Sequence, residues 1–64
     1  MFLSQTEVFN FLRSVRKMYV SAEEISLKTG LSVISVRKAL KRLYKWGEVE
    51  MRKGEKNQKY WRAI

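Results

Sequence analysis

Five basic side chains recur at intervals of one, three or four residues in the middle of the chain: Arg37, Lys38, Lys41, Arg42 and Lys45. No acidic residue occurs between Ser32 and Lys45. Spacings of three and four bring side chains together on one face of a helix, where like charges repel each other and opposite charges stabilise the helix. Such a face indicates an anionic partner that neutralises it. A solvated basic face without a partner is the alternative.

Four basic residues and one asparagine surround Gly54 near the end of the chain: Arg52, Lys53, Lys56, Lys59 and Asn57. Polar and apolar residues alternate over residues 48–52, and residues 59–64 also have the composition of a strand. We therefore predict a hairpin over about residues 48–64 with a polar turn at 53–57. Its basic tip is one of two places where an anionic partner could bind. The alternative is a soluble turn whose lysines protect an exposed strand edge from aggregation.

The distribution of charge supports a polyanionic partner. The 64-residue chain has a formal net charge of +8. Residues 1–36 carry four Lys and Arg against three Glu, whereas residues 37–64 carry ten against three. A basic half of this kind favours nucleic acid or an acidic membrane surface, and charge alone does not distinguish them.

The residue types that are missing exclude several kinds of chemistry. The sequence contains no Cys and no His, so disulfides, the usual zinc sites and the commonest general base and thiol nucleophile are absent. No Gly-rich phosphate loop is present either. We expect no enzymatic activity, no cofactor and no metal. The apolar start at residues 1–3 is too short for a signal peptide, which predicts a cytoplasmic protein.

Three serine-based capping patterns predict where helices begin. Ser4 with Glu7 and Ser21 with Glu24 have the S-x-x-E spacing, and Ser32 is followed by Ser35. We predict helices over about residues 5–17, 22–29 and 33–46, the last two ending at glycines 30 and 47. Arg16 and Lys17 would then occupy the last turn of the first helix, where basic residues suit the dipole.

Helical periodicity assigns one apolar face to each helix. The expected core positions are Val8, Phe11, Leu12, Val15, Ile25, Val33, Val36, Ala39, Leu40 and Leu43, with Leu27 as a further candidate. Trp46, Tyr60 and Trp61 are interpreted as core and hairpin packing. Phe2 and Phe9 exceed what this core needs, which makes them candidates for a dimer surface.

The order helix, helix, helix, hairpin resembles the winged helix-turn-helix regulators of bacteria, archaea and archaeal viruses. The resemblance rests on residues 21–25, on Thr29-Gly30-Leu31-Ser32 between two helices, on residues 36–43, and on residues 47–49. It covers roughly residues 21–62, and residues 2–17 occupy the place of the usual first helix. It implies an α+β fold in a single domain, residues 1–64: a three-helix winged helix-turn-helix with a C-terminal β-hairpin wing.

The resemblance also implies a function, namely sequence-specific binding of double-stranded DNA by a transcriptional regulator. Helix 33–46 would enter the major groove, and the wing at 52–59 would lie on the backbone or in the minor groove. The expected contact residues are Ser32, Val33, Ile34, Ser35, Arg37, Lys38, Lys41, Arg42, Lys45, Arg52, Lys53, Lys56, Asn57 and Lys59. For Ile34, contact with a thymine methyl, a dimer contact and simple exposure remain alternatives, and Val33 is also a core candidate.

The expected partners follow from the same resemblance. A homodimer is expected through the first helix, the N-terminus or the wing, with no membrane association and no small-molecule ligand. The protein would be found with the DNA in the cytoplasm, or in the host cytoplasm if it is viral. Two other functions remain open: a winged-helix module that docks an acidic protein, and a protein that coats nucleic acid without sequence preference.

Overall fold

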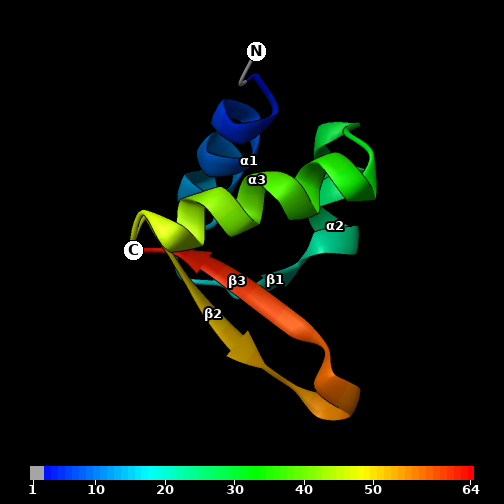
Figure 1. The fold of residues 1–64 in the computed structure, drawn as a ribbon, viewed down its shortest axis with the longest axis vertical. Coiled ribbons are helices and arrows are strands. Elements are labelled where there is room, and N and C mark those ends of the chain that lie inside the picture. Colours follow the sequence, from blue (N-terminus) through cyan, green and yellow to red (C-terminus); the bar gives the residue numbers. More distant parts are fainter. Residues whose placement is uncertain (1–2) are drawn as a thin grey trace.

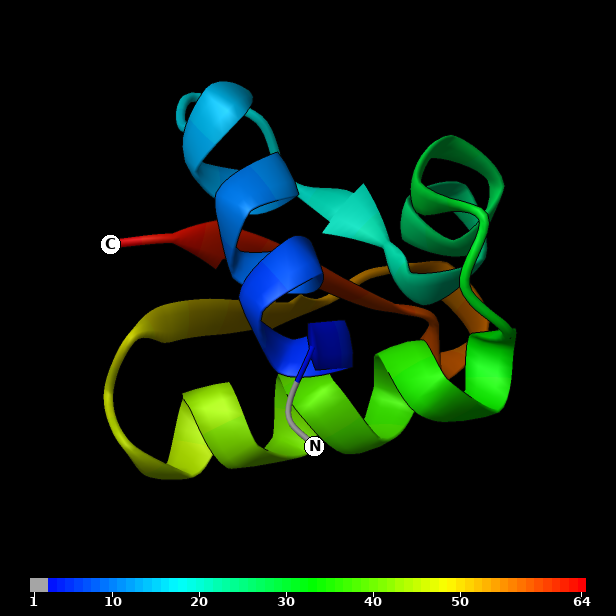
Figure 2. The same ribbon diagram turned by 90° about the horizontal axis from the view of Figure 1, so that it is seen from above.

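Three helices pack on one side of a small sheet in the computed structural model, which describes residues 3–64 (Figure 1). The helices are α1 (Leu3–Ser14), α2 (Ala22–Thr29) and α3 (Val33–Lys45). α3 runs along one side of the molecule, and the end of α1 lies at the opposite side (Figure 2). The fold is the α+β winged helix-turn-helix that the sequence predicts.

The sheet has three antiparallel strands in the order β1-β3-β2. The hairpin comprises β2 (Val49–Lys53) and β3 (Lys59–Ala63), joined through a 3-10 turn η1 (Glu55–Asn57). The hairpin extends away from the helices toward the lower part of Figure 1. The sequence did not predict β1 (Val20–Ser21), whose residues pair with Trp61 and Tyr60 of β3.

One hydrophobic core lies between the helices and the inner face of the sheet. The buried residues that the helices contribute are Val8, Leu12, Ala22, Ile25, Val36, Ala39, Leu40 and Leu43, and β1 contributes Val20. The sheet adds Val49, Trp61 and Ala63, and Phe11 and Val15 pack against the edge of the core. Most of the predicted core positions are confirmed, but Val33 is only partly buried.

Two of the three predicted helix caps are formed. The Ser21 hydroxyl accepts a hydrogen bond from the Glu24 N–H at 3.2 Å, and the Ser32 hydroxyl accepts one from the Ser35 N–H at 3.1 Å. Each bond satisfies an N–H that has no partner within the helix. Gly30 ends α2 at φ 81°, a left-handed conformation that glycine adopts without steric cost. The Gly30 turn and the Ser32 cap therefore determine where α3 begins, and the start of the helix determines which way its side chains point.

The bounds of α1 differ from the prediction at both ends. The helix begins at Leu3, so Ser4 is a helical residue and not the N-cap. It ends at Ser14, whose hydroxyl donates to the Phe11 carbonyl at 2.6 Å and competes with the helical hydrogen bonds. Arg16 and Lys17 consequently lie in the turn after the helix. α3 ends at Lys45, one residue before the predicted end.

Three apolar residues are placed differently from the prediction. Leu27 is 81% exposed, because Ala22 and Ile25 form the inner face of α2 and Leu27 points the other way. Trp46 is 64% exposed, because it follows the last turn of α3 at the C-cap and does not reach the core, whereas Trp61 of β3 is buried. Phe9, a candidate for a dimer surface, is partly buried and packs against the core. The other dimer candidate, Phe2, lies outside the described residues.

A polar cluster on the outer face of the sheet fixes the hairpin to the segment before β1. Glu50 accepts hydrogen bonds from the Tyr19 hydroxyl at 2.8 Å and from Arg62 Nη2 at 3.0 Å. The Arg62 guanidinium also lies 4.6 Å from the centre of the Tyr19 ring. The hydrogen bonds from Arg62 and then Tyr19 hold the pKa of the Glu50 carboxyl below its usual value. This cluster supports the base of the hairpin.

Within residues 3–64, no helix combines the length and the apolar character that crossing a membrane requires.

Candidate nucleic-acid interface

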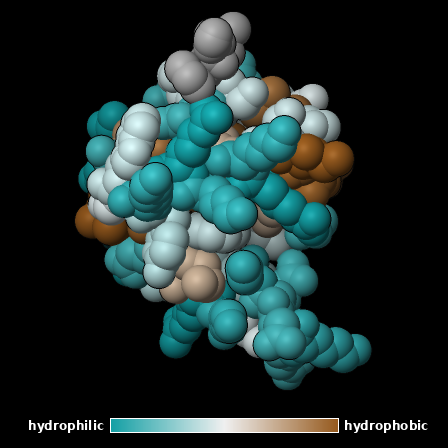
Figure 3. Space-filling model, viewed as in Figure 1, coloured by the Kyte–Doolittle hydropathy of each residue, from teal (hydrophilic) through white to brown (hydrophobic). Residues whose placement is uncertain are grey.

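The exposed face of α3 carries all five of its basic residues. Val36, Ala39, Leu40 and Leu43 turn inward, and the opposite side of the helix presents Ile34, Arg37, Lys38, Lys41, Arg42 and Lys45 to solvent. The space-filling view shows hydrophilic side chains across the front of α3 and over the hairpin tip (Figure 3). At the start of the helix Ser32 is exposed, whereas Val33 and Ser35 are partly buried.

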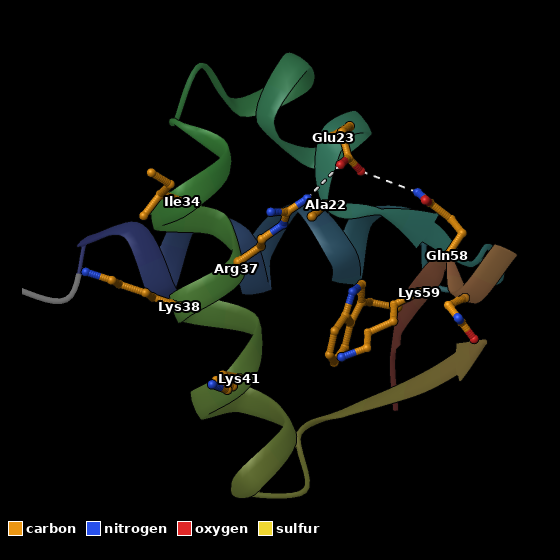
Figure 4. A pocket seen from close by; sticks show the side chains of 10 residues that line it. Ala22, Glu23, Ile34, Arg37, Lys38, Lys41, Gln58 and Lys59 are labelled. Atoms are coloured by element: carbon orange, nitrogen blue, oxygen red, sulfur yellow. Dashed lines mark hydrogen bonds and ion pairs between the residues drawn. The ribbon is translucent and has the colours of Figure 1, made fainter. Parts of the chain in front are cut away.

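An open groove of about 530 Å³ separates this face from the hairpin (Figure 4). The side of the groove formed by α3 consists of Ile34, Arg37, Lys38 and Lys41. The other side and the floor consist of Asn57, Gln58, Lys59, Trp61, Ala22 and Glu23. Six of the residues predicted from the sequence to contact DNA therefore line one groove, although more than fifteen positions separate the two groups along the chain.

One carboxylate joins the two sides of the groove. Glu23, the second residue of α2, accepts a hydrogen bond from Arg37 Nη2 at 2.9 Å and another from Gln58 Nε2 at 3.4 Å. The two bonds use different carboxylate oxygens, so the side chain bridges α3 and the turn of the hairpin (Figure 4). Sequence reasoning missed both Glu23 and Gln58.

The charge in the groove is strongly positive, with Glu23 as the single acid among the lining residues. Arg37, Lys38, Lys41 and Lys59 line the same groove, and of these Arg37 contacts Glu23. The pKa of the Glu23 carboxyl lies below its usual value, through a hydrogen bond with its own backbone and then through Arg37 and Gln58. Glu23 is therefore ionised at neutral pH. The groove can accept a polyanion and has one fixed negative charge at its end.

The tip of the hairpin concentrates positive charge at an energetic cost. Lys53 and Lys59 are direct cross-strand partners, and like charges opposite each other destabilise a sheet. Lys56 adopts φ 56°, a conformation that a non-glycine residue adopts only at some cost. Gly54 allows the tight approach of Tyr60, since a Cβ there would lie 2.7 Å from Tyr60 Cε2. A bound anion would offset the repulsion between the two lysines.

Not all predicted residues share one surface. Arg52 lies over the Tyr19 ring, 5.4 Å from its centre, on the outer face of the sheet and away from the groove. Lys53 and Lys56 are exposed at the tip but do not line the groove, and neither do Arg42 and Lys45.

The buried aromatic residue beneath the groove is Trp61, which Tyr44 contacts edge-on at 5.9 Å between ring centres. Because Trp61 is only 9% exposed, it supports the groove and offers little surface for stacking a base.

Comparison of the chain with family models, with curated proteins and with solved structures gives no match.

Proposed function

We propose that this protein binds double-stranded DNA at specific sequences and acts as a transcriptional regulator in the cytoplasm. α3 enters the major groove, with Arg37 and Lys38 nearest to base edges, Lys41 at a base or phosphate, and Arg42 and Lys45 toward the backbone. The hairpin tip lies on the neighbouring phosphates. Arg52 is left out of this interface because its guanidinium lies over Tyr19 on the other face of the sheet.

The observation that carries the proposal is the juxtaposition of two basic elements across one groove. The exposed face of α3 has no acidic residue. The facing hairpin adds Lys59, which lies directly across from Lys53, so the two positive charges repel each other. A helix of this kind fits the major groove of B-DNA, and side chains on a neighbouring hairpin reach the phosphates. Arg37 and Ile34 offer the two chemistries that read base edges, namely hydrogen-bond donors for guanine and an apolar contact for thymine.

A binding titration tests the proposal against its two rivals. The probes are a duplex selected by the protein from a randomised pool and a duplex of random sequence. We expect tighter binding to the selected duplex at physiological salt. Equal affinities would support coating without sequence preference. Absence of binding to either duplex at low salt would instead favour an acidic protein as the partner.

The salt dependence of affinity measures how many phosphates the protein neutralises. If about six phosphates are contacted, log K should fall against log salt with a slope of about −5. If Lys41 contacts a phosphate, Lys41→Ala should make that slope less steep by about one unit. Binding that does not respond to salt would contradict DNA as the partner.

The hairpin tip should contribute to affinity but not to stability. Replacing Lys53 and Lys56 together by Ala should leave the melting temperature almost unchanged or raise it slightly, since exposed charges contribute little to folding and the repulsion between Lys53 and Lys59 is relieved. The same change should weaken binding to selected and random duplexes by similar factors, because phosphate contacts carry no base information.

The matched control removes two positive charges at the far side of the molecule. Arg16 and Lys17 are exposed in the turn after α1, opposite α3 (Figure 2). Replacing both by Ala should weaken binding clearly less than the change at the hairpin tip. Equal losses for the two pairs would show that net charge alone matters and would remove the hairpin from the interface.

A homodimer is the expected binding form, because many regulators match a two-fold DNA site with two protein copies. Within the described residues, the apolar side chains more than half exposed outside α3 are Met18, Leu27, Trp46 and Ile64.

A further inference from the structure

The acid at the end of the basic groove needs an explanation, because its charge opposes the binding of any polyanion. Glu23 lines the groove and lies 2.9 Å from the guanidinium of Arg37. None of the other lining residues is acidic, so a phosphate that enters the groove meets the negative charge of Glu23. Removing this charge would strengthen binding to DNA of any sequence. The presence of Glu23 is therefore not explained by affinity for DNA.

Stability does not explain the ion pair. The side chains of Arg37 and Glu23 are 63% and 55% exposed, and ion pairs between such exposed groups contribute little to folding. The first turn of α2 also contains Glu24, which suits the helix dipole equally well. What distinguishes Glu23 is that its carboxylate contacts both α3 and the hairpin turn.

We infer that Glu23 is a specificity-determining residue that positions Arg37 for reading bases and keeps it from binding phosphates. This inference rests on the proposed function and assigns a role to a residue that does not itself contact a base. The ion pair holds one Nη atom of Arg37 and leaves other N–H donors of the guanidinium free. A guanidinium held in this way can donate to the O6 and N7 atoms of a guanine at a fixed position.

On DNA of random sequence the same arrangement is unfavourable. A free Arg side chain turns toward the nearest phosphate and gains affinity on every sequence alike. Glu23 competes with that phosphate for Arg37 and repels the backbone through its own charge. The bond to Gln58 ties Glu23 to the hairpin turn, so the carboxylate is held from both sides. Binding without a guanine at the right position is therefore weakened more than binding to the selected site.

The test compares E23Q with the matched variant E24Q. Both remove one negative charge from the first turn of α2, but only Glu23 lines the groove. Affinity is measured for the 64-residue protein on the selected duplex and on a random duplex over a range of salt. Melting curves confirm that each variant is folded.

For E23Q we expect tighter binding to random duplex by up to about fivefold, which corresponds to the upper range for an exposed charge pair. The salt slope on random duplex should become steeper by about one unit, because Arg37 then takes a phosphate. The ratio of affinities for selected over random duplex should fall. E24Q should leave that ratio and the slope close to those of the wild type.

A cycle with R37A identifies the residue through which Glu23 acts. In the R37A background, E23Q should no longer change the salt slope. An unchanged ratio in E23Q, equal behaviour of E23Q and E24Q, or a slope change that persists without Arg37 would each overturn the inference. These outcomes leave the proposed function intact. That function fails on its own if the wild type binds no duplex or does not distinguish the two duplexes.

Discussion

Replacing Leu40 by Ala should lower the free energy of unfolding by about 2–5 kcal/mol, the range for removing a large aliphatic side chain from a packed core. Leu40 is fully buried on the inner face of α3, where the helix packs against α1. Its loss leaves a cavity at the centre of the molecule. A domain of this size buries only about 60% of the surface that its unfolded chain exposes, less than a larger domain does, and therefore has little stability in reserve. Urea and thermal unfolding of the two proteins measure the difference.

The neighbouring residue provides the control for Leu40→Ala. Lys41 is exposed on the other side of the same helix, so Lys41→Ala should change the unfolding free energy by less than about 0.5 kcal/mol. The two variants should also differ in binding. Leu40→Ala should reduce the amount of folded protein and leave the ratio of affinities for selected and random duplexes unchanged. A loss of stability below about 1 kcal/mol would show that α3 does not pack on α1 as described.

Local chemistry explains why the second and third helices were predictable. Ser21, Ser32 and Gly30 act within one turn of the chain, so their sequence positions set the start of both helices and the end of α2. The basic face of α3 was predictable for the same reason, since a spacing of three or four residues determines which side chains share a face. Ser4 has the same spacing to a glutamate as Ser21 but lies within α1, because the helix already begins at Leu3.

Tertiary contacts decided the features that the sequence did not indicate. β1 has two residues, which is too short for any alternation, and it exists because Val20 and Ser21 pair with β3. Positions 46 and 61 hold the same residue type, yet the fold buries Trp61 against Tyr44 and leaves Trp46 exposed. A single sequence contains no local signal that distinguishes two such residues.

The groove itself was only half predictable. The sequence indicated Arg37 and Lys59 as separate basic clusters on a helix and a hairpin. It did not show that both would line one groove with Glu23. The bonds of Glu23 join residues 14 and 35 positions apart in the chain, and no local rule relates such positions. An acid in the first turn of a helix is ordinarily explained by the helix dipole, which made Glu23 easy to overlook.

Arg37→Ala should cost about 1–3 kcal/mol of binding free energy on the selected duplex, the range for a lost bidentate contact to guanine. Arg37 is exposed on the outer face of α3 and lines the groove, so the change should leave the melting temperature almost unaltered. Random duplex should also be bound more weakly, because one positive charge is lost and Glu23 is left without its partner. The loss on the selected duplex should be clearly the larger of the two.

Arg37→Lys separates base reading from charge. Lys keeps the positive charge beside Glu23, but its ammonium group cannot donate two parallel hydrogen bonds as the guanidinium does. We therefore expect binding to random duplex to stay close to that of the wild type, while the selected duplex loses much of what Arg37→Ala loses. The same titrations measure both variants. If Arg37→Lys binds both duplexes as the wild type does, Arg37 acts as a charge alone, and base reading must come from Ser32, Ile34, Ser35 or Lys38.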